Sequence, residues 1–230
     1  MPGALEKIFI LIPAYNEEKT IGKVIQDLNK HGYRNIIVID DGSSDNTTEI
    51  ALSYLNVIVL KHLVNLGPGS AIKSGFDYAL ESKADIAVTF DADGQHMAKD
   101  IISLLRPLES GRYDVVLGNR FHNSSGSIPV FKRVVLKLGT FLIFLMYGVF
   151  LHDTHNGLKA FNRVALNRID IISSGWEYCS EIIEEIKIKK LRFIEIPVTV
   201  KYSEYSVKKG QKIYNSFYIL SKMIMKWIFG

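Results

Sequence analysis

Short, nearly uninterrupted apolar runs alternate with amphipathic segments along the first half of the chain. Runs of this kind are typical of strands that are covered on both faces, as in a parallel sheet between two layers of helices. They predict five β-strands, at Ile8–Ile12, Asn35–Asp40, Val57–Leu60, Ile86–Phe90 and Tyr113–Gly118.

The segments between these strands carry the pattern of helices with one buried face. Ile21, Val24, Ile25 and Leu28 recur at helical spacing, and Gly32 follows where a helix would end. Further helices are predicted at Asn46–Leu55, Gly69–Ser82 and Lys99–Glu109. This alternation predicts an α/β fold with a mostly parallel sheet flanked by helices. Such sheets bind ligands at the carboxyl ends of their strands.

The second half of the chain has a less regular pattern. It predicts a long apolar helix, a short strand, a second helix and an extended segment that Pro197 interrupts: Pro129–Leu151, Leu158–Asn162, Tyr178–Lys189 and Phe193–Lys201. A last, amphipathic helix is predicted over Gln211–Phe229, with Lys222 and Lys226 on its polar side.

The composition is that of a globular protein, with 47% hydrophobic and 23% charged residues in a chain of 230. The single cysteine, Cys179, cannot form an internal disulfide, which favours a reducing compartment. No Cys/His spacing indicates a zinc site, so oxygen ligands would have to hold any metal. We expect no signal peptide, because the apolar run Ile8–Ile12 is too short.

Charge is distributed unevenly along the chain. The net charge is +4, but the segment from Lys187 to the end has ten Lys or Arg and only two acidic residues, or +8. The first 186 residues therefore carry −4. A basic tail on an acidic body suggests an anionic partner, either a nucleic acid or a phospholipid surface. No nucleic-acid recognition module is evident, so we expect a membrane surface.

Acidic and amide residues follow three of the predicted strands at the point where each strand ends. They lie in Pro13–Glu18, Asp40–Asp45 and Asp91–His96. Any one of these clusters could simply form a turn. Three at one edge of a sheet would repel one another unless a cation or a polar ligand compensated their charge.

The third cluster has the pattern of a metal site. Asp91 and Asp93 can both face a ligand if the chain bends directly after the strand, and Gly94 makes that bend easy. With the Gln95 amide oxygen they form an incomplete set of hard oxygen ligands, which suits Mg²⁺ or Mn²⁺ and leaves positions open for diphosphate oxygens. A single D-x-D occurs by chance in many chains. This one supports a metal site because it directly follows a predicted buried strand, with two other acidic clusters at the same edge.

Seven motifs come in order and at suitable spacing: IPAYNEE, IDDGSSDNT, NLGPGSA, FDADGQH, GNR, DTHNGLKAF and EIPVTVKYSEYSVKKGQ. With them, the chain from Ile8 to Gln211 resembles the family 2 glycosyltransferases of the GT-A fold. It is most similar to the branch that transfers mannose or glucose to dolichyl or polyprenyl phosphate. The resemblance implies one domain, with a nucleotide-sugar half (1–118), an acceptor half (119–211) and a C-terminal amphipathic helix (212–230).

The resemblance also implies a role for individual residues. Asp91, Asp93 and Gln95 would hold the Mg²⁺ or Mn²⁺ ion. Arg120 would lie beside the diphosphate, where a guanidinium suits phosphate oxygens, and Arg133 would lie there or at a lipid surface. The residues implied to bind the nucleotide sugar are Pro13, Tyr15, Glu17, Asp40, Asp41, Asp91, Ala92, Arg120 and Arg133.

Among these residues, Tyr15 would pack on the nucleoside, unless it is a core aromatic. Asp41 would accept a hydrogen bond from the base, and Asp40 would order the loop.

The implied reaction is an inverting displacement in which a hexose leaves a GDP-mannose or UDP-glucose type of donor. Asp93 and Arg120 would be catalytic. A hydroxyl acceptor needs a general base, for which Asp153 and Glu177, and also Glu181, are candidates. A lipid phosphate is already ionised and needs none. Relatives that use hydroxyl acceptors often carry a Glu-Asp pair near Glu177, and Tyr178 departs from that pattern, which favours a phosphate acceptor.

We expect attachment to the cytoplasmic face of a membrane without a span. The longest uncharged run, Leu138–Leu151, has 14 residues, roughly 21 Å of helix at ~1.5 Å per residue, against a hydrocarbon core of ~30 Å. This run and the C-terminal helix would contact the bilayer. The alternatives are packing within the domain, a homo-oligomer interface or a membrane partner protein.

Three other functions remain open from the sequence. The acceptor could be a hydroxyl of a glycan or of a lipid-linked saccharide. A sugar nucleotidyltransferase is disfavoured, because no Gly-rich loop with Arg or Lys follows the first strand. A non-catalytic nucleotide-sugar-binding protein is disfavoured by the intact Asp91, Asp93 and Gln95.

Overall fold

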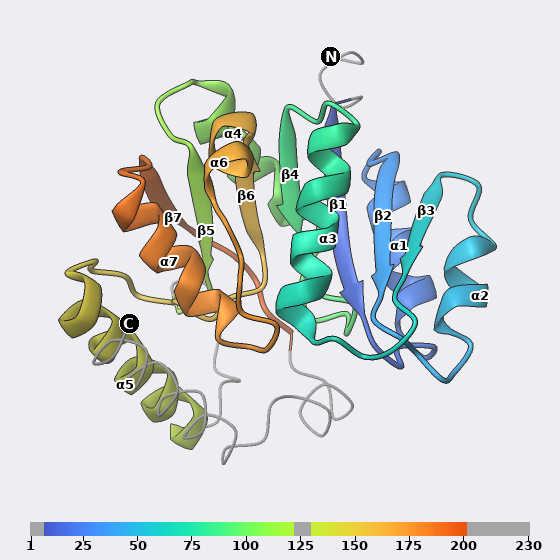
Figure 1. Ribbon diagram of the computed structural model, residues 1–230, viewed down its shortest axis with the longest axis horizontal. Helices are drawn as coiled ribbons and strands as arrows, with labels where there is room; N and C mark the ends of the chain where they lie inside the picture. Colours follow the sequence, from blue (N-terminus) through green and yellow to red (C-terminus); the bar gives the residue numbers. More distant parts are fainter. Residues whose placement is uncertain (1–6, 122–129, 202–230) are drawn as a thin grey trace.

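The computed structural model describes residues 7–121 and 130–201, which fold around one seven-stranded sheet (Figure 1). The strands lie in the order β3-β2-β1-β4-β6-β5-β7. Their bounds are β1 (Ile8–Ala14), β2 (Asn35–Asp40), β3 (Val57–Lys61), β4 (Ile86–Thr89), β5 (Val115–Asn119), β6 (Lys159–Asn162) and β7 (Phe193–Pro197).

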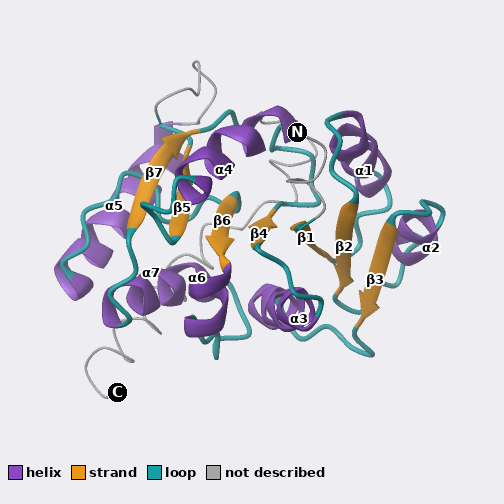
Figure 2. Ribbon diagram, turned by 90° about the horizontal axis from the view of Figure 1, so that it is seen from above, coloured by secondary structure: helices purple, strands orange, loops and turns teal. Residues whose placement is uncertain are grey.

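Helices cover both faces of this sheet (Figure 2). Helices α3, α6 and α7 lie on one face, and α1 and α4 lie on the other. The bounds are α1 (Ile21–Lys30), α2 (Thr47–Leu52), α3 (Pro68–Glu81), α4 (Ile101–Glu109), α5 (Val130–Tyr147), α6 (Arg163–Arg168) and α7 (Tyr178–Ile188). Successive residues of a strand point to opposite faces, so Phe9 and Leu11 of β1 belong to one core, and Ile8, Ile10 and Ile12 to the other. This confirms the predicted α/β fold.

The sheet is mostly parallel, as predicted. Its one antiparallel strand, β6, determines which loop lies at the carboxyl edge beside β4 and β5. β6 runs antiparallel between β4 and β5, whereas β1, β2, β3 and β4 pair in parallel, as do β5 and β7. A strand that runs in the opposite direction begins at the edge where its neighbours end. The loop at residues 153–158, which leads into β6, therefore lies at the carboxyl ends of β4 and β5.

Helix α5 is shorter than the predicted helix over Pro129–Leu151. It ends at Tyr147, because Gly148 adopts a φ of 66°, which terminates a helix and turns the chain away. In the segment that follows, Val149 and Leu151 are buried, whereas Phe150 and His152 are exposed. The prediction was wrong for these last residues, and the short helix α6 was not predicted at all.

The length and apolar character of the described helices decide whether any of them could span a membrane. None of them is both long and apolar enough to cross a bilayer. Helix α5 lies beside α7 toward the carboxyl edge of the sheet (Figure 1). The predicted helix Gln211–Phe229 lies outside the described residues.

One carboxylate joins three strands at the opposite edge of the sheet. Asp114, just before β5, accepts hydrogen bonds from the Arg192 backbone N–H at 2.9 Å and from Nε and Nη2 of the Arg192 guanidinium at 3.0 and 2.8 Å. Asn162, at the end of β6, donates to it at 3.1 Å. The hydrogen bonds from Arg192 outweigh the effect of burial and lower the pKa of Asp114 to about 2.

We expect Asp114→Asn to lower the free energy of unfolding at pH 7 by about 1–3 kcal/mol, because Arg192 loses a charged partner. The Asp114 pKa is depressed on folding, so its stabilisation is complete above the unfolded value, ~3.9, and is lost as pH falls toward 2. Urea unfolding at pH 7 and pH 3 should therefore show a smaller difference between variant and wild type at pH 3. An equal difference at both values would contradict this assignment.

Candidate active site

A pocket of about 330 Å³ opens at the carboxyl edge of the sheet, where β1, β2 and β4 end side by side. Residues from all three predicted acidic clusters line it, including Tyr15, Asp41 and Asp93. The complete lining is Pro13, Ala14, Tyr15, Glu17, Asp41, Asn65, Pro68, Ala71, Asp93 and Trp176. The sheet therefore brings residues of all three clusters to one cavity, as expected from the sequence.

The loop after β1 is fastened to the loop after β2. The Asn16 backbone N–H donates to Ser43 Oγ at 2.9 Å, and the Glu17 N–H donates to Thr47 Oγ1 at 2.7 Å. Tyr15, directly before these two anchors, is 45% exposed and lines the pocket. Tyr15 is therefore not a core aromatic. Glu17 is buried beside it and accepts a hydrogen bond from Thr20 Oγ1 at 2.7 Å.

The two aspartates that follow β2 have different surroundings. Asp40 is fully buried and accepts hydrogen bonds from the Ser43 N–H in its own loop and from the Thr48 hydroxyl at the start of α2. The Asp41 carboxylate accepts hydrogen bonds from the N–H groups of Leu66 and Gly67 at 2.9 and 2.8 Å. These contacts fix the segment that leads into α3, so Asp41 shapes the pocket wall.

His62 holds the Asp41 carboxylate in place through a second contact with α3. Its Nδ1 lies 2.7 Å from Asp41 Oδ1, and its Nε2 lies 2.9 Å from Ser74 Oγ on α3. His62 could not be singled out from the sequence, because it is an isolated histidine at the end of a predicted strand. A direct hydrogen bond from Asp41 to a nucleotide base stays a prediction.

Asp93 is the carboxylate of the D-x-D motif that faces the pocket. Burial, together with the negative charge of Asp91, raises the pKa of Asp93 to about 6. The Gln95 backbone N–H and side-chain Nε2 donate to its two oxygens at 3.0 and 2.7 Å. Gln95 thus fixes the orientation of Asp93, and Ala92 between the aspartates is buried.

Asp91 lies against a different set of groups. His96 Nε2 is 2.9 Å from its Oδ2. Burial would raise the pKa of Asp91, but His96 and the positive charges of Lys159 and Arg120 outweigh it and lower the pKa. The carboxylate packs on the backbone of Gly157, where a Cβ would come within 2.1 Å of Oδ1. A larger residue at position 157 would therefore have to displace the Asp91 carboxylate.

The D-x-D residues suit a hard divalent cation in part. Across residues 7–121 and 130–201, no three His, Cys, Asp or Glu side chains gather into a metal site. Two carboxylates and an amide make an incomplete set, which a substrate diphosphate would have to complete. Burial first, and then the negative charge of Asp91, raise the pKa of Asp93, and a bound cation would offset both effects by stabilising the carboxylate.

Arg120 and Asp153 form a buried ion pair beside this site. Arg120 is 7% exposed and Asp153 2%. The guanidinium Nε lies 2.6 Å from Asp153 Oδ2, and Nη2 donates to the His155 backbone oxygen at 2.6 Å. The pair forms because the antiparallel β6 brings the loop at residues 153–158 to the end of β5. Sequence reasoning named both residues but did not pair them.

This geometry argues against Asp153 as a general base. Burial would raise the pKa of Asp153, but its ion pair and hydrogen bonds with Arg120 outweigh burial and lower the pKa. Burial also lowers the pKa of His155 to about 4, so this neighbour is neutral at pH 7. Asp153 is best described as the residue that positions Arg120.

The other candidate bases do not line the pocket. Glu177 directly precedes α7, and its carboxylate packs on Gly175, where a Cβ would lie 2.5 Å from Oε2. Glu181 is buried and accepts hydrogen bonds from the Ile172 and Ser173 N–H groups at 3.2 and 2.9 Å. Glu181 therefore stabilises a loop.

Sequence reasoning missed Trp176, which is 47% exposed and also lines the pocket. Its loop packs against the start of α3, where the Gly69 N–H donates to the Ser174 oxygen at 2.7 Å. The proposed phosphate ligand Arg133 is exposed on α5 and does not line the pocket.

Comparisons with known proteins agree on one family. Residues 9–170 match the model of glycosyl transferase family 2. The UDP-N-acetylglucosamine–dolichyl-phosphate N-acetylglucosaminyltransferase of Methanococcus voltae is 37% identical, over 95% of this chain and 95% of that enzyme. The polyprenol monophosphomannose synthase of Mycolicibacterium smegmatis is 28% identical, over 89% of this chain and 81% of that one.

A solved structure shows the same fold. The glucosyl-3-phosphoglycerate synthase of Mycobacterium tuberculosis, in complex with Mn²⁺, uridine diphosphate and glucosyl-3-phosphoglycerate, superposes with a TM-score of 0.73. The match covers 99% of this chain and 82% of that one, at 18% sequence identity. The fold is therefore that of the GT-A glycosyltransferases.

Proposed function

The chain belongs to glycosyl transferase family 2, in the dolichyl- and polyprenyl-phosphate branch, and from this premise we propose that it transfers a sugar from a nucleoside diphosphate to a polyprenyl or dolichyl phosphate. The observation that carries the proposal is the shared pocket. Tyr15, Asp41 and Asp93 come from three strand ends and line one cavity that is large enough for part of a nucleotide sugar.

The donor would bind with its nucleoside on the β1 side of the pocket. Pro13 and the exposed Tyr15 ring supply a packing surface, and the Glu17 carboxylate supplies an acceptor for ribose or base hydroxyl and N–H groups. Trp176 also lines this pocket. Its position favours contact with the sugar, because it belongs to the half of the chain that would meet the acceptor.

Asp91, Asp93 and Gln95 would hold a Mg²⁺ or Mn²⁺ ion, which when bound supplies positive charge to the donor diphosphate. Arg120 would add a second, fixed positive charge. Its guanidinium is held by Asp153 and by the His155 backbone oxygen, so it needs little reorganisation to meet the leaving diphosphate.

The reaction would be a single displacement with inversion. An acceptor phosphate oxygen attacks the anomeric carbon, and the bond from that carbon to the diphosphate oxygen breaks. The electron pair leaves with the nucleoside diphosphate. An ionised phosphate needs no base, whereas a hydroxyl does. The site favours phosphate because Asp153 and Glu181 are engaged in structural contacts and Glu177 does not line the pocket.

The donor can be identified by its effect on thermal stability. A ligand that binds the folded protein stabilises it according to its concentration and Kd. GDP, UDP and their sugar conjugates should be compared with Mn²⁺ or EDTA, with UDP-N-acetylglucosamine tested first because of the Methanococcus voltae relative. We expect one nucleotide series to raise Tm only with metal. No shift with any nucleotide would count against the proposal.

We also propose that helix α5 contacts the acceptor membrane. Val134 and Leu145 are exposed and lie three helical turns apart on α5, so they share one side of the helix. We expect Val134→Glu with Leu145→Glu to reduce sedimentation with anionic vesicles several-fold, since apolar burial is lost. The control Leu55→Glu changes an exposed residue near β3 and should have no effect. Unchanged sedimentation of the α5 variant would exclude this contact.

A further inference from the structure

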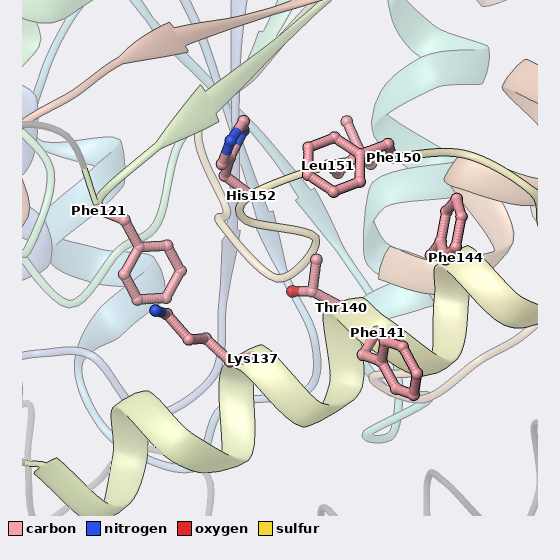
Figure 3. A pocket seen from close by; sticks show the side chains of 8 residues that line it. All are labelled: Phe121, Lys137, Thr140, Phe141, Phe144, Phe150, Leu151 and His152. Atoms are coloured by element: carbon pink, nitrogen blue, oxygen red, sulfur yellow. The ribbon is translucent and has the colours of Figure 1, made fainter.

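A second cavity, of about 310 Å³, lies between α5 and the segment that follows it (Figure 3). It exists because the chain leaves the helix at Gly148 and returns along it. Phe121, which follows β5, closes one end. The remaining lining is Lys137, Thr140, Phe141, Phe144, Phe150, Leu151 and His152, and we call this cavity the α5 groove.

The α5 groove has a polar end and an apolar end. Lys137 reaches from α5 toward Phe121 at one end, and the rings of Phe144 and Phe150 lie at the other (Figure 3). These two rings meet edge to face, with centroids 6.1 Å apart. Phe141 is also largely exposed, and three solvent-facing phenylalanines around one cavity indicate an apolar ligand.

The polar end of the groove adjoins the active site. Phe121 directly follows Arg120, and His152 directly precedes Asp153, so the two groove residues flank the buried ion pair. Glu195 on β7 fixes this junction, because its carboxylate accepts hydrogen bonds from the N–H groups of His152 and Asp153 at 2.9 and 3.0 Å.

We propose that the α5 groove binds the first isoprene units of the acceptor lipid, with the phosphate at the Lys137 end and the chain directed toward Phe144 and Phe150. This inference rests on the proposed function. A long amphiphile with one anionic end matches the distribution of charge and apolar surface along the groove. Its volume is at the lower end of the ~300–1,000 Å³ of small-molecule sites, so it holds only the start of a long chain.

Binding of the lipid chain in the groove would also help to orient the acceptor phosphate for reaction. Isoprene units seated between α5 and residues 149–152 would place the phosphate against the same junction that holds Arg120. Binding energy from this remote part of the substrate would then orient the reacting phosphate. We expect kcat/KM to rise over the first few isoprene units and then stay level for longer chains.

The test uses isoprenyl phosphates of one to eleven isoprene units, with detergent for the longer ones, and a saturating donor. The variant Phe141→Ala with Phe144→Ala removes two groove walls. It should lose about ten- to hundredfold in kcat/KM with the longer acceptors, because each lost apolar contact weakens binding. With the one-unit acceptor it should stay within about twofold of wild type. The control Ile188→Ala changes an exposed apolar residue on α7, outside the groove, and should behave as wild type.

A second variant, Thr140→Phe, fills the groove instead of enlarging it, and should abolish the dependence on chain length. An unchanged length dependence in both variants would overturn the groove assignment, and so would an equal loss with the one-unit acceptor. Failure of the proposed function looks different: wild type would then bind the nucleotide but transfer sugar to none of the isoprenyl phosphates.

Discussion

Replacing Asp93 by asparagine should lower kcat for sugar transfer by about a thousandfold or more, while the fold survives. Asp93 lines the pocket, and Gln95 fixes both of its carboxylate oxygens. Asparagine keeps the shape of this side chain but removes the charge that a divalent cation needs. The diphosphate would then have to leave without that compensation. EDTA should have a comparable effect on the wild-type enzyme.

The measurement is a single-turnover assay with a saturating donor, together with urea unfolding to verify the fold. Asp77→Asn is the matched control, since Asp77 is exposed on the middle of α3, which starts beside the pocket. It should retain wild-type kcat. Full activity in Asp93→Asn, or in wild type with excess EDTA, would refute metal assistance through this motif.

The second large effect concerns the buried ion pair. Arg120→Ala leaves the Asp153 carboxylate buried without its partner and should lower the free energy of unfolding by about 3–5 kcal/mol. It should also lower kcat by about a hundredfold or more, because a fixed positive charge beside the leaving diphosphate is lost. Adding Asp153→Ala should recover much of the stability, since no charge then remains unpaired, but none of the activity.

The double variant therefore separates a structural role of Arg120 from a catalytic one. Urea unfolding and single-turnover rates should be measured for both single variants and for the double. The exposed Arg168→Ala on α6 is the control for loss of an arginine. Recovery of activity together with stability in the double variant would show that Arg120 acts only by holding the fold.

Much of the nucleotide side of the site could be predicted from the sequence, because it depends on local rules. The apolar runs that became β1, β2 and β4 are buried on both faces, and parallel strands end at one edge. This is enough to bring Tyr15, Asp41 and Asp93 to one pocket. Gly94, with a φ of 75°, forms the bend that was expected directly after Asp91 and Asp93.

The acceptor side depends on contacts between distant parts of the chain, which a local pattern does not contain. The antiparallel direction of β6 pairs Asp153 with Arg120, a contact that favours a positioning role for Asp153. His62 and Trp176 enter the site through packing on α3. The apolar pattern from Phe141 to Leu151 fits one continuous helix as well as it fits a helix that ends at Tyr147 and is followed by an extended segment packed along it. The α5 groove was therefore not predictable from the sequence.

The central claim is that a lipid phosphate accepts the sugar, and one product analysis tests it most directly. The purified protein is incubated with the donor found by thermal shift, Mn²⁺, a polyprenyl phosphate and a lipid-linked saccharide, and the lipids are analysed by mass spectrometry. We predict a polyprenyl phosphate whose mass has increased by one sugar residue, with equimolar nucleoside diphosphate released. An extended saccharide with unmodified polyprenyl phosphate would contradict the account.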